Sequence, residues 1–162
     1  MNTEERREFV RAHRTAVLGY GRKEDGPAMS IVYHTTEPDG TILVSTMGDR
    51  AKAKACARLG KVSLCVLDEQ WPPTYLQVYC DVTVDDDFDH TVDAMMRIGG
   101  VMAGRELDPS VRPLVEEGAR VEGRVVLRLR PYATFETPPK HVSSEADINA
   151  DLLHSTSASQ PW

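Results

Sequence analysis

The chain lacks long apolar segments, and it lacks the cysteine patterns of disulfide frameworks and zinc ribbons. No stretch approaches the roughly 18 apolar residues that span a bilayer, so no membrane partner is expected. The three cysteines, Cys56, Cys65 and Cys80, are an odd number at spacings that suit neither framework. We therefore interpret them as buried thiols and expect a reducing, cytoplasmic setting.

Basic residues are also scarce. The 162-residue chain has 19 Lys and Arg against 25 Asp and Glu, which gives it a net charge of −6. Domains that bind the phosphate backbone of nucleic acids are normally basic, so nucleic acid is not an expected partner. Hydrophobic residues at 41% and charged residues at 27% are typical of a globular protein, and the length fits one domain.

Several catalytic and ligand motifs are absent as well. The sequence has no G-x-S-x-G nucleophile elbow, no P-loop and no G-x-G-x-x-G dinucleotide fingerprint. None of the five histidines lies near another His or Cys at metal-ligand spacing, so no metal site is predicted. Tyr33 and His34, at the end of a predicted strand, are weaker candidates for contact with a ligand.

The spacing of apolar residues predicts strands with helices between them. A first helix begins with the capping pair Asn2 and Glu5 and ends near residue 14. Strands are predicted at 15–20, 28–35, 41–46, 62–67, 74–84 and 121–130, and helices at 49–59 and 88–102. The turn sequences EDGP and EPDG separate the first three strands, and Gly60 caps the second helix. The methionines of the last helix are interpreted as core filler.

This order of elements predicts a mainly β fold with flanking helices, namely a six-stranded antiparallel barrel. A single domain is expected over residues 1–137. Residues 138–162 are polar and without periodicity, which predicts a tail that is poorly ordered or packed on a partner subunit. The arginines on one face of the last strand are interpreted as facing solvent or a subunit, in preference to a second anion site.

The stretch from Ser45 to Lys54 (STMGDRAKAK) carries the clearest indication of chemistry. Two hydroxyls end a strand, a glycine follows, and a helix then begins with cations in its first turn, where the helix dipole disfavours positive charge. Five cations and one acid lie between Ser45 and Lys61. A bound phosphate would compensate this arrangement, because free N–H groups, hydroxyls and an arginine favour an anion at one point.

The helical period separates these cations into two sets. At about 100° per residue, Lys52 lies on the side of Cys56 and Leu59, which should face the protein body. The others form an outer stripe of Arg50, Lys54 and Arg58. The alternative to an anion site is a solvated face past which Lys52 extends its apolar stem, and the charge pattern alone leaves both open.

Residues 6 to 84 resemble the pyridoxamine-phosphate-oxidase-like split barrels, also called FMN-binding split barrels, and in particular the branch that uses the deazaflavin coenzyme F420. The shared plan is helix, strand, D-G-x-P-type turn, strand, second turn, strand ending in S-T, R-x-K on a helix, and a V-S-L strand. The chain departs from the family on the second strand, where MSIVYH replaces a V-T-P-V-W-F run. It departs again after R-x-K, where Ala55-Cys56 replaces N-L.

The resemblance implies a homodimer of split barrels with a cofactor site at the interface, built from both chains. It implies that four residues hold the cofactor phosphate, namely Ser45, Thr46, Arg50 and Lys52. A strand would lie along the ring system through its backbone, with Met29, Ser30, Ile31 and Val32. Gln77 would also reach a cofactor.

The function that the resemblance implies is that of an F420-dependent oxidoreductase, which transfers a hydride between reduced deazaflavin and an unsaturated small-molecule substrate. Lys54 and Arg58 would suit the acidic tail of the deazaflavin. An FMN-dependent oxidase or reductase on the same barrel and a non-catalytic flavin- or haem-binding protein are the alternatives. No catalytic side chain is predicted, although Tyr33, His34 and Tyr79 are candidates for delivering a proton.

Overall fold

The computed structural model describes residues 1–70, 74–137 and 159–162. Its strands form one antiparallel sheet in the order β2-β1-β5-β6-β7-β4-β3, with β8 beside β7. They are β1 (Thr15–Tyr20), β2 (Ala28–Tyr33), β3 (Thr35–Thr36), β4 (Ile42–Met47), β5 (Lys61–Asp68), β6 (Thr74–Asp85), β7 (Arg124–Thr137) and β8 (Gln160–Pro161). The predicted fold class, mainly β and antiparallel with flanking helices, is confirmed, and two strands of two residues, β3 and β8, add to the six expected.

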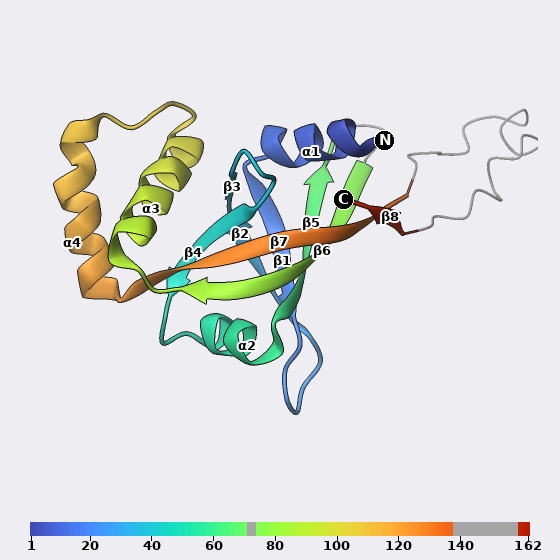
Figure 1. Ribbon diagram of the computed structural model, residues 1–162, viewed down its shortest axis with the longest axis horizontal. Helices are drawn as coiled ribbons and strands as arrows, with labels where there is room; N and C mark the ends of the chain where they lie inside the picture. The colour runs from blue at the N-terminus through green and yellow to red at the C-terminus, as the bar shows by residue number, and fades with distance from the viewer. Residues whose placement is uncertain (71–73, 138–158) are drawn as a thin grey trace, which may run out of the picture.

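The helices are α1 (Thr3–Ala12), α2 (Ala51–Leu59), α3 (Phe88–Ala103) and α4 (Arg112–Glu122), with a 3-10 turn at Pro109–Val111. Figure 1 shows α3 and α4 side by side at one end of the molecule, and α1 and α2 above and below the strands in this view. The prediction missed α4 and was wrong about the start of the last strand, because Val121 and Glu122 still belong to α4. Among the described residues, no helix combines the length and apolar character that a bilayer crossing requires.

Local signals in the sequence set several element ends as predicted. The Asn2 side chain accepts a hydrogen bond from the Glu5 N–H at 2.9 Å, and the Glu5 carboxylate accepts one from the Asn2 N–H at 2.6 Å. This reciprocal capping box satisfies two donors that the helix start leaves free. Gly60 ends α2 in the left-handed conformation with a φ of 66°, which a residue with a Cβ adopts only with strain.

The inside of the barrel is filled by alternate residues of the strands. On β6 the inner face consists of Leu76, Val78, Cys80 and Val82, which are all buried. The largest fully buried side chains on the neighbouring strands are Leu18, Ile42, Leu64, Leu127 and Leu129. The side chains of opposite parity on β2, β4 and β7 face away from this core, so they are available for a site on the barrel surface.

The barrel has an open seam between β2 and β4. β2 pairs only with β1, and β4 pairs with β7 along its length but with β3 only at Ile42 and Leu43, within the described part of the chain. No ladder of hydrogen bonds joins β2 to β4. The backbone of β4 from residue 44 to residue 47 therefore has one unpaired edge, which faces the seam.

The end of the chain returns to the barrel. β8 pairs with β7 through Ala133 and Thr134, and the Arg6 guanidinium donates a hydrogen bond of 2.6 Å to the Pro161 carbonyl. Trp162 packs against the barrel core, and the Arg7 guanidinium lies 5.6 Å from the centre of its ring. Most of the predicted polar tail, residues 138–158, lies outside the described residues.

Gly40 is expected to be the least replaceable glycine of the fold. Its φ is +89°, and a Cβ would lie 2.9 Å from Nε1 of Trp162. We expect Gly40→Ala to lower the free energy of unfolding by about 2 kcal/mol, from backbone strain and steric conflict together. The measurement is urea unfolding.

Two further variants separate the two causes. Gly60→Ala has a similar positive φ of +66° but no neighbour within 4 Å of the new Cβ, so it should cost only the strain. Gly40→Ala should therefore lower the free energy of unfolding more than Gly60→Ala does. In a Trp162→Ala background this difference should disappear. An equal cost in both backgrounds would contradict the steric part of the explanation.

Candidate functional site

A cavity of about 720 Å³ opens at the seam between β2 and β4. Its walls come from residues 30–33 of β2, residues 45–47 of β4, the start of α2 and one face of α3. Seven of the nine predicted site residues line it, namely Ser30, Ile31, Val32, Ser45, Thr46, Arg50 and Lys52. The seam is thus where the structure brings together the strand and the helix start that the sequence singled out.

A tight turn holds the start of α2 against β7. The Gly48 N–H donates a 2.8 Å hydrogen bond to the Gly123 carbonyl, and a Cβ at Gly48 would lie 3.1 Å from a Val125 methyl group. A glycine therefore allows the chain to turn this close to β7. Arg50 is the N-cap of α2 but provides no side-chain cap, and no acidic residue lies in the first turn. The N-terminal N–H groups of α2 are left for another acceptor.

Three cations gather at this corner. Lys52 is half-buried, and burial lowers its pKa, with a smaller contribution from the positive charges of Arg50 and Arg124. Arg50 is exposed and its Nε lies 3.4 Å from Sδ of Met47. The Asp and Glu residues that the structure describes do not reach this cavity, so none of them lines it. An excess of positive charge with desolvation at Lys52 favours an anionic ligand.

Two hydroxyl groups in the same cavity have no partner. Ser30 Oγ and Ser45 Oγ are buried and make no hydrogen bond with any described residue. A buried hydroxyl without a partner costs about 1–3 kcal/mol, and a bound acceptor would remove that cost. The cations and the free N–H groups at this corner therefore suit a phosphate or a similar oxyanion, which is the first of the two alternatives that the charge pattern left open.

Arg124 is the member of this corner that the sequence analysis missed. It faces Met47 across the β4–β7 ladder and lines the cavity. Of the arginines on this strand, Arg130 is exposed, whereas Arg124 and Arg128 are half-buried; whether they face a subunit stays a prediction. The spacing of these arginines along one strand was the available signal, because alternate residues of a strand share a face.

Two predicted cofactor residues lie elsewhere. Met29 is 74% exposed and contributes to a shallow groove with Tyr79 and Tyr132. Gln77 is half-buried on β6, opposite Cys65 on β5 and Phe135 on β7, and does not line the cavity.

The three candidate proton donors lie in different places. Tyr33 lines the cavity, whereas Tyr79 stacks on Tyr132 with ring centroids 6.4 Å apart. His34 is buried, neither ring nitrogen has a partner among the described residues, and burial lowers its pKa to about 4. It is therefore neutral at pH 7 and out of reach of a ligand, which leaves Tyr33 as the one of the three in position.

Helix α3 supplies a wall that the sequence analysis did not predict. Met95 and Met102 line the cavity, and Met102 is 52% exposed, so their interpretation as core filler is wrong. The buried face of α3 is formed by Thr91, Val92, Ala94 and Ile98. The prediction that Leu59 faces the protein body is also wrong, since Leu59 is 42% exposed, whereas Lys52 and Cys56 do lie inward.

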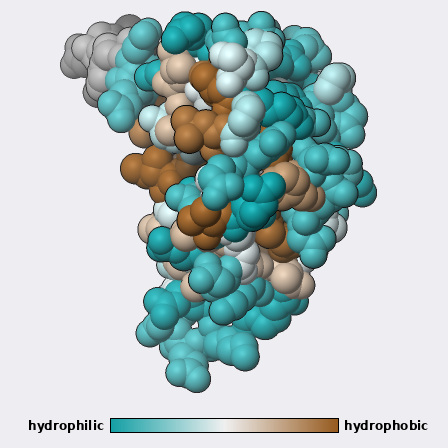
Figure 2. Space-filling view, turned by 90° about the vertical axis from the view of Figure 1, so that its left-hand side faces the viewer, coloured by the Kyte–Doolittle hydropathy of each residue, from teal (hydrophilic) through white to brown (hydrophobic). Residues whose placement is uncertain are grey.

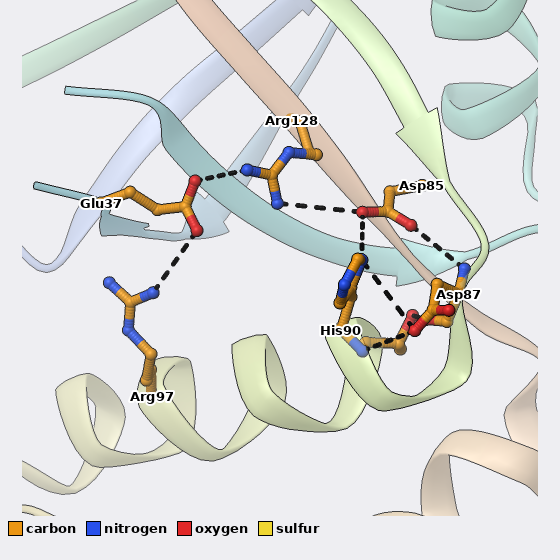
Figure 3. A network of polar contacts seen from close by, with 7 residues as sticks. Glu37, Asp85, Asp87, His90, Arg97 and Arg128 are labelled. Carbon is orange, nitrogen blue, oxygen red and sulfur yellow. Dashed lines mark hydrogen bonds and ion pairs between the residues drawn. The ribbon is translucent and has the colours of Figure 1, made fainter. Parts of the chain in front are cut away.

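A second cavity, of about 770 Å³, lies on the other side of α3, and Leu107 contributes to both. Most of its charged residues pair with one another, and Figure 3 shows one such network. Arg128 donates a hydrogen bond to Glu37 and lies 3.8 Å from Asp85, which in turn lies 3.0 Å from Nδ1 of His90. That carboxylate raises the pKa of His90. Because these charges compensate one another, the cavity at the seam is the better candidate for an ionic ligand.

Comparisons with known proteins support the fold. No family model and no curated protein matches the chain. Among solved structures, a conserved hypothetical protein, Rv2991 from Mycobacterium tuberculosis, matches with a TM-score of 0.75 and 17% identity over 89% of this chain and 92% of its own. A Clostridium acetobutylicum protein related to general stress protein 26, of the pyridoxinephosphate oxidase family, matches with a TM-score of 0.66 and 10% identity. The match covers 98% of this chain and 92% of that protein's chain. An F420 reductase matches with a TM-score of 0.61 and 18% identity, over 78% of this chain and 93% of the reductase chain.

These similarities define the fold of the chain. It is an antiparallel split barrel with flanking helices, of the kind found in pyridoxamine-phosphate-oxidase-like proteins. At identities of 10% to 18% the comparison concerns the fold, and the site carries any argument about function.

Proposed function

We propose that this protein is an F420-dependent oxidoreductase that transfers a hydride between reduced deazaflavin and an unsaturated small organic substrate. The observation that supports this most directly is the cation corner at the seam, where Arg50, Lys52 and Arg124 face a cavity without a carboxylate from the described residues. One of the similar folds is an F420 reductase, and its chain is covered almost entirely.

The chain's own residues would hold the cofactor at its phosphate. Arg50, Lys52 and the N–H groups at the start of α2 provide charge and donors, and Ser45 and Thr46 add hydroxyls from the end of β4. The edge of β2 that faces β4 is unpaired within the described part of the chain, and its backbone would lie along the ring system of the cofactor. When bound, the deazaflavin supplies the hydride chemistry, so the protein has to position and desolvate the reactants. Tyr33 is placed to hold or deliver a proton at its phenol oxygen.

Deazaflavin is preferred to FMN because the cationic surface extends beyond the phosphate corner. A smaller depression next to the cavity is lined by Arg22, Lys23, Lys54 and Arg58, and it shares Tyr20 and Ala51 with the cavity. The acidic tail of the deazaflavin would run along these four cations. FMN ends at its phosphate and would leave them unused.

The proposal includes a homodimer with the cofactor sites at its interface. The outer face of the edge strand β2 exposes Met29, Ile31 and Tyr33, with 74% of Met29 and 76% of Ile31 accessible. Apolar side chains on an edge strand are normally covered by a partner. In such a dimer Met29 and Gln77 would contact the cofactor held by the other subunit. The three cysteines are all free, which supports the cytoplasm as the compartment.

Titration of the purified protein with the deazaflavin and with FMN tests the proposal. We expect the deazaflavin to bind at least tenfold more tightly, because each exposed contact between a cation and the tail contributes about 0.5 kcal/mol or more. A Lys54→Glu, Arg58→Glu variant should remove this preference while leaving the affinity for FMN within about twofold. Binding of neither cofactor, or tighter binding of FMN by both proteins, would rule out the deazaflavin assignment.

A further inference from the structure

The cavity at the seam has an uncharged end as well as a cationic one. Among the residues that the structure describes, its charged lining residues are Arg50, Lys52 and Arg124, and the first and last of these lie close enough to Lys52 to lower its pKa. All the charge is thus at one corner. A separate part of the lining is apolar and is formed by Met95, Ile98, Met102, Leu107 and Val115, from α3, α4 and the loop between them.

This apolar wall is held in place by a close contact between α3 and the loop. Leu107 packs on Gly99, where an added Cβ would lie 2.7 Å from Cδ1 of the leucine. The loop backbone lies close as well, because a Cβ at Gly100 would lie 3.2 Å from the Arg105 carbonyl oxygen. The wall is therefore present before any ligand arrives, as is usual for small-molecule sites.

The wall also leaves apolar surface in contact with water. Met102 is 52% exposed, and Ile31 on the facing strand β2 is 76% exposed. Figure 2 looks at the molecule from the side of α3 and α4, and apolar side chains gather around the middle of this face, between polar regions above and below. Covering such surface is favourable in proportion to its area, and flexible methionine side chains adapt to ligands of different outline.

The geometry points to a neutral, apolar molecule as the substrate, bound between the α3–α4 wall and Ile31 while the anionic cofactor occupies the cation corner. This inference rests on the proposed function and deepens it, because it names the substrate class of the same site. A charged substrate would find no counter-ion at the apolar wall and would lose its hydration there. The cavity volume of about 720 Å³ lies within the range of small-molecule sites.

The test uses N-phenyl-1-naphthylamine, an uncharged dye whose fluorescence rises in apolar surroundings, with the full-length protein and no added cofactor. The wild type should bind the dye, and Met102→Lys and Met102→Glu should both weaken binding about tenfold or more, because a charge of either sign is unfavourable at an apolar wall. Met102→Leu should bind within about twofold of the wild type. Leu114→Lys is the matched control, because Leu114 is 75% exposed on α4 and lies outside the cavity lining.

Three results would overturn the inference: no dye binding by the wild type, dye binding by either charged variant as tight as that of the wild type, or a loss in the Leu114→Lys control as large as in the Met102 variants. The cofactor titration of Met102→Lys keeps the two proposals distinct, because its affinity for deazaflavin should equal that of the wild type. If the dye pattern holds and no cofactor binds, the proposed function fails while the apolar site stands. If the cofactor binds and the dye pattern fails, only the substrate class is wrong.

Discussion

An Arg50→Glu, Lys52→Glu double variant is expected to bind deazaflavin or FMN at least about 100-fold more weakly than the wild type. Both side chains line the cavity where Ser30 Oγ and Ser45 Oγ lack partners. A charge-assisted hydrogen bond contributes about 1.5–3 kcal/mol, so the loss of two such bonds corresponds to this factor or more. The measurement is a fluorescence titration of each cofactor at fixed ionic strength.

The control for this variant has the same change in net charge at a distance from the cavity. Arg105 and Arg130 are exposed and do not line it, so Arg105→Glu, Arg130→Glu should leave both affinities within about twofold. If the two double variants lose affinity equally, general electrostatic attraction explains the binding. If neither loses affinity, the cation corner does not bind the phosphate.

Acid is expected to destabilise the protein through His34. The side chain is 2% exposed, and burial lowers its pKa from 6.5 to about 4, with a smaller contribution from the nearby positive charge of His13. The unfolded chain therefore binds a proton between pH 6.5 and pH 4 that the folded chain does not, so stability falls as the pH falls through this window. A shift of this size corresponds to about 2–3 kcal/mol lost between pH 7.5 and pH 4.5.

His34→Leu should abolish this part of the pH dependence. Urea unfolding at pH 7.5 and at pH 4.5 measures it, and between the two pH values the variant should lose about 2–3 kcal/mol less stability than the wild type. His90→Gln is the matched control with the opposite sign, because Asp85 raises the pKa of His90, so this pair stabilises the fold at low pH and loses its effect as the pH rises. Parallel pH profiles for the wild type and His34→Leu would contradict the assignment.

The parts of the fold and site that the sequence predicted are those determined locally. The capping box at Asn2, the turn at Gly40 and the left-handed cap at Gly60 each depend on residues within one turn of chain. The clustering of cations around the start of α2 was also visible in the sequence, and the anion that it would bind stays a prediction. Lys52 illustrates this, since helical geometry alone placed it inward.

The parts that could not be predicted depend on contacts distant in sequence. α4 contains Pro113 and Gly118, and Val121, Gly123 and Val125 continue the period-two pattern of β7 back across the end of the helix. Periodicity alone cannot show where such a helix ends. The methionines of α3 form an apolar face whether they meet the core or a cavity, so only the packing of α3 against the seam identified their role. Arg124 reaches the site through its register with Met47.

Because no strand bridges β2 and β4, the distance between them is not set by the regular spacing of a hydrogen-bonded ladder. Side chains of α3 and of the start of α2 line the gap instead. Substitutions at positions such as Met95 can widen or narrow the gap without breaking a backbone hydrogen bond of the barrel. A scaffold of this kind can accommodate ligands of new shapes through substitutions in one helix, at little cost to its folding stability.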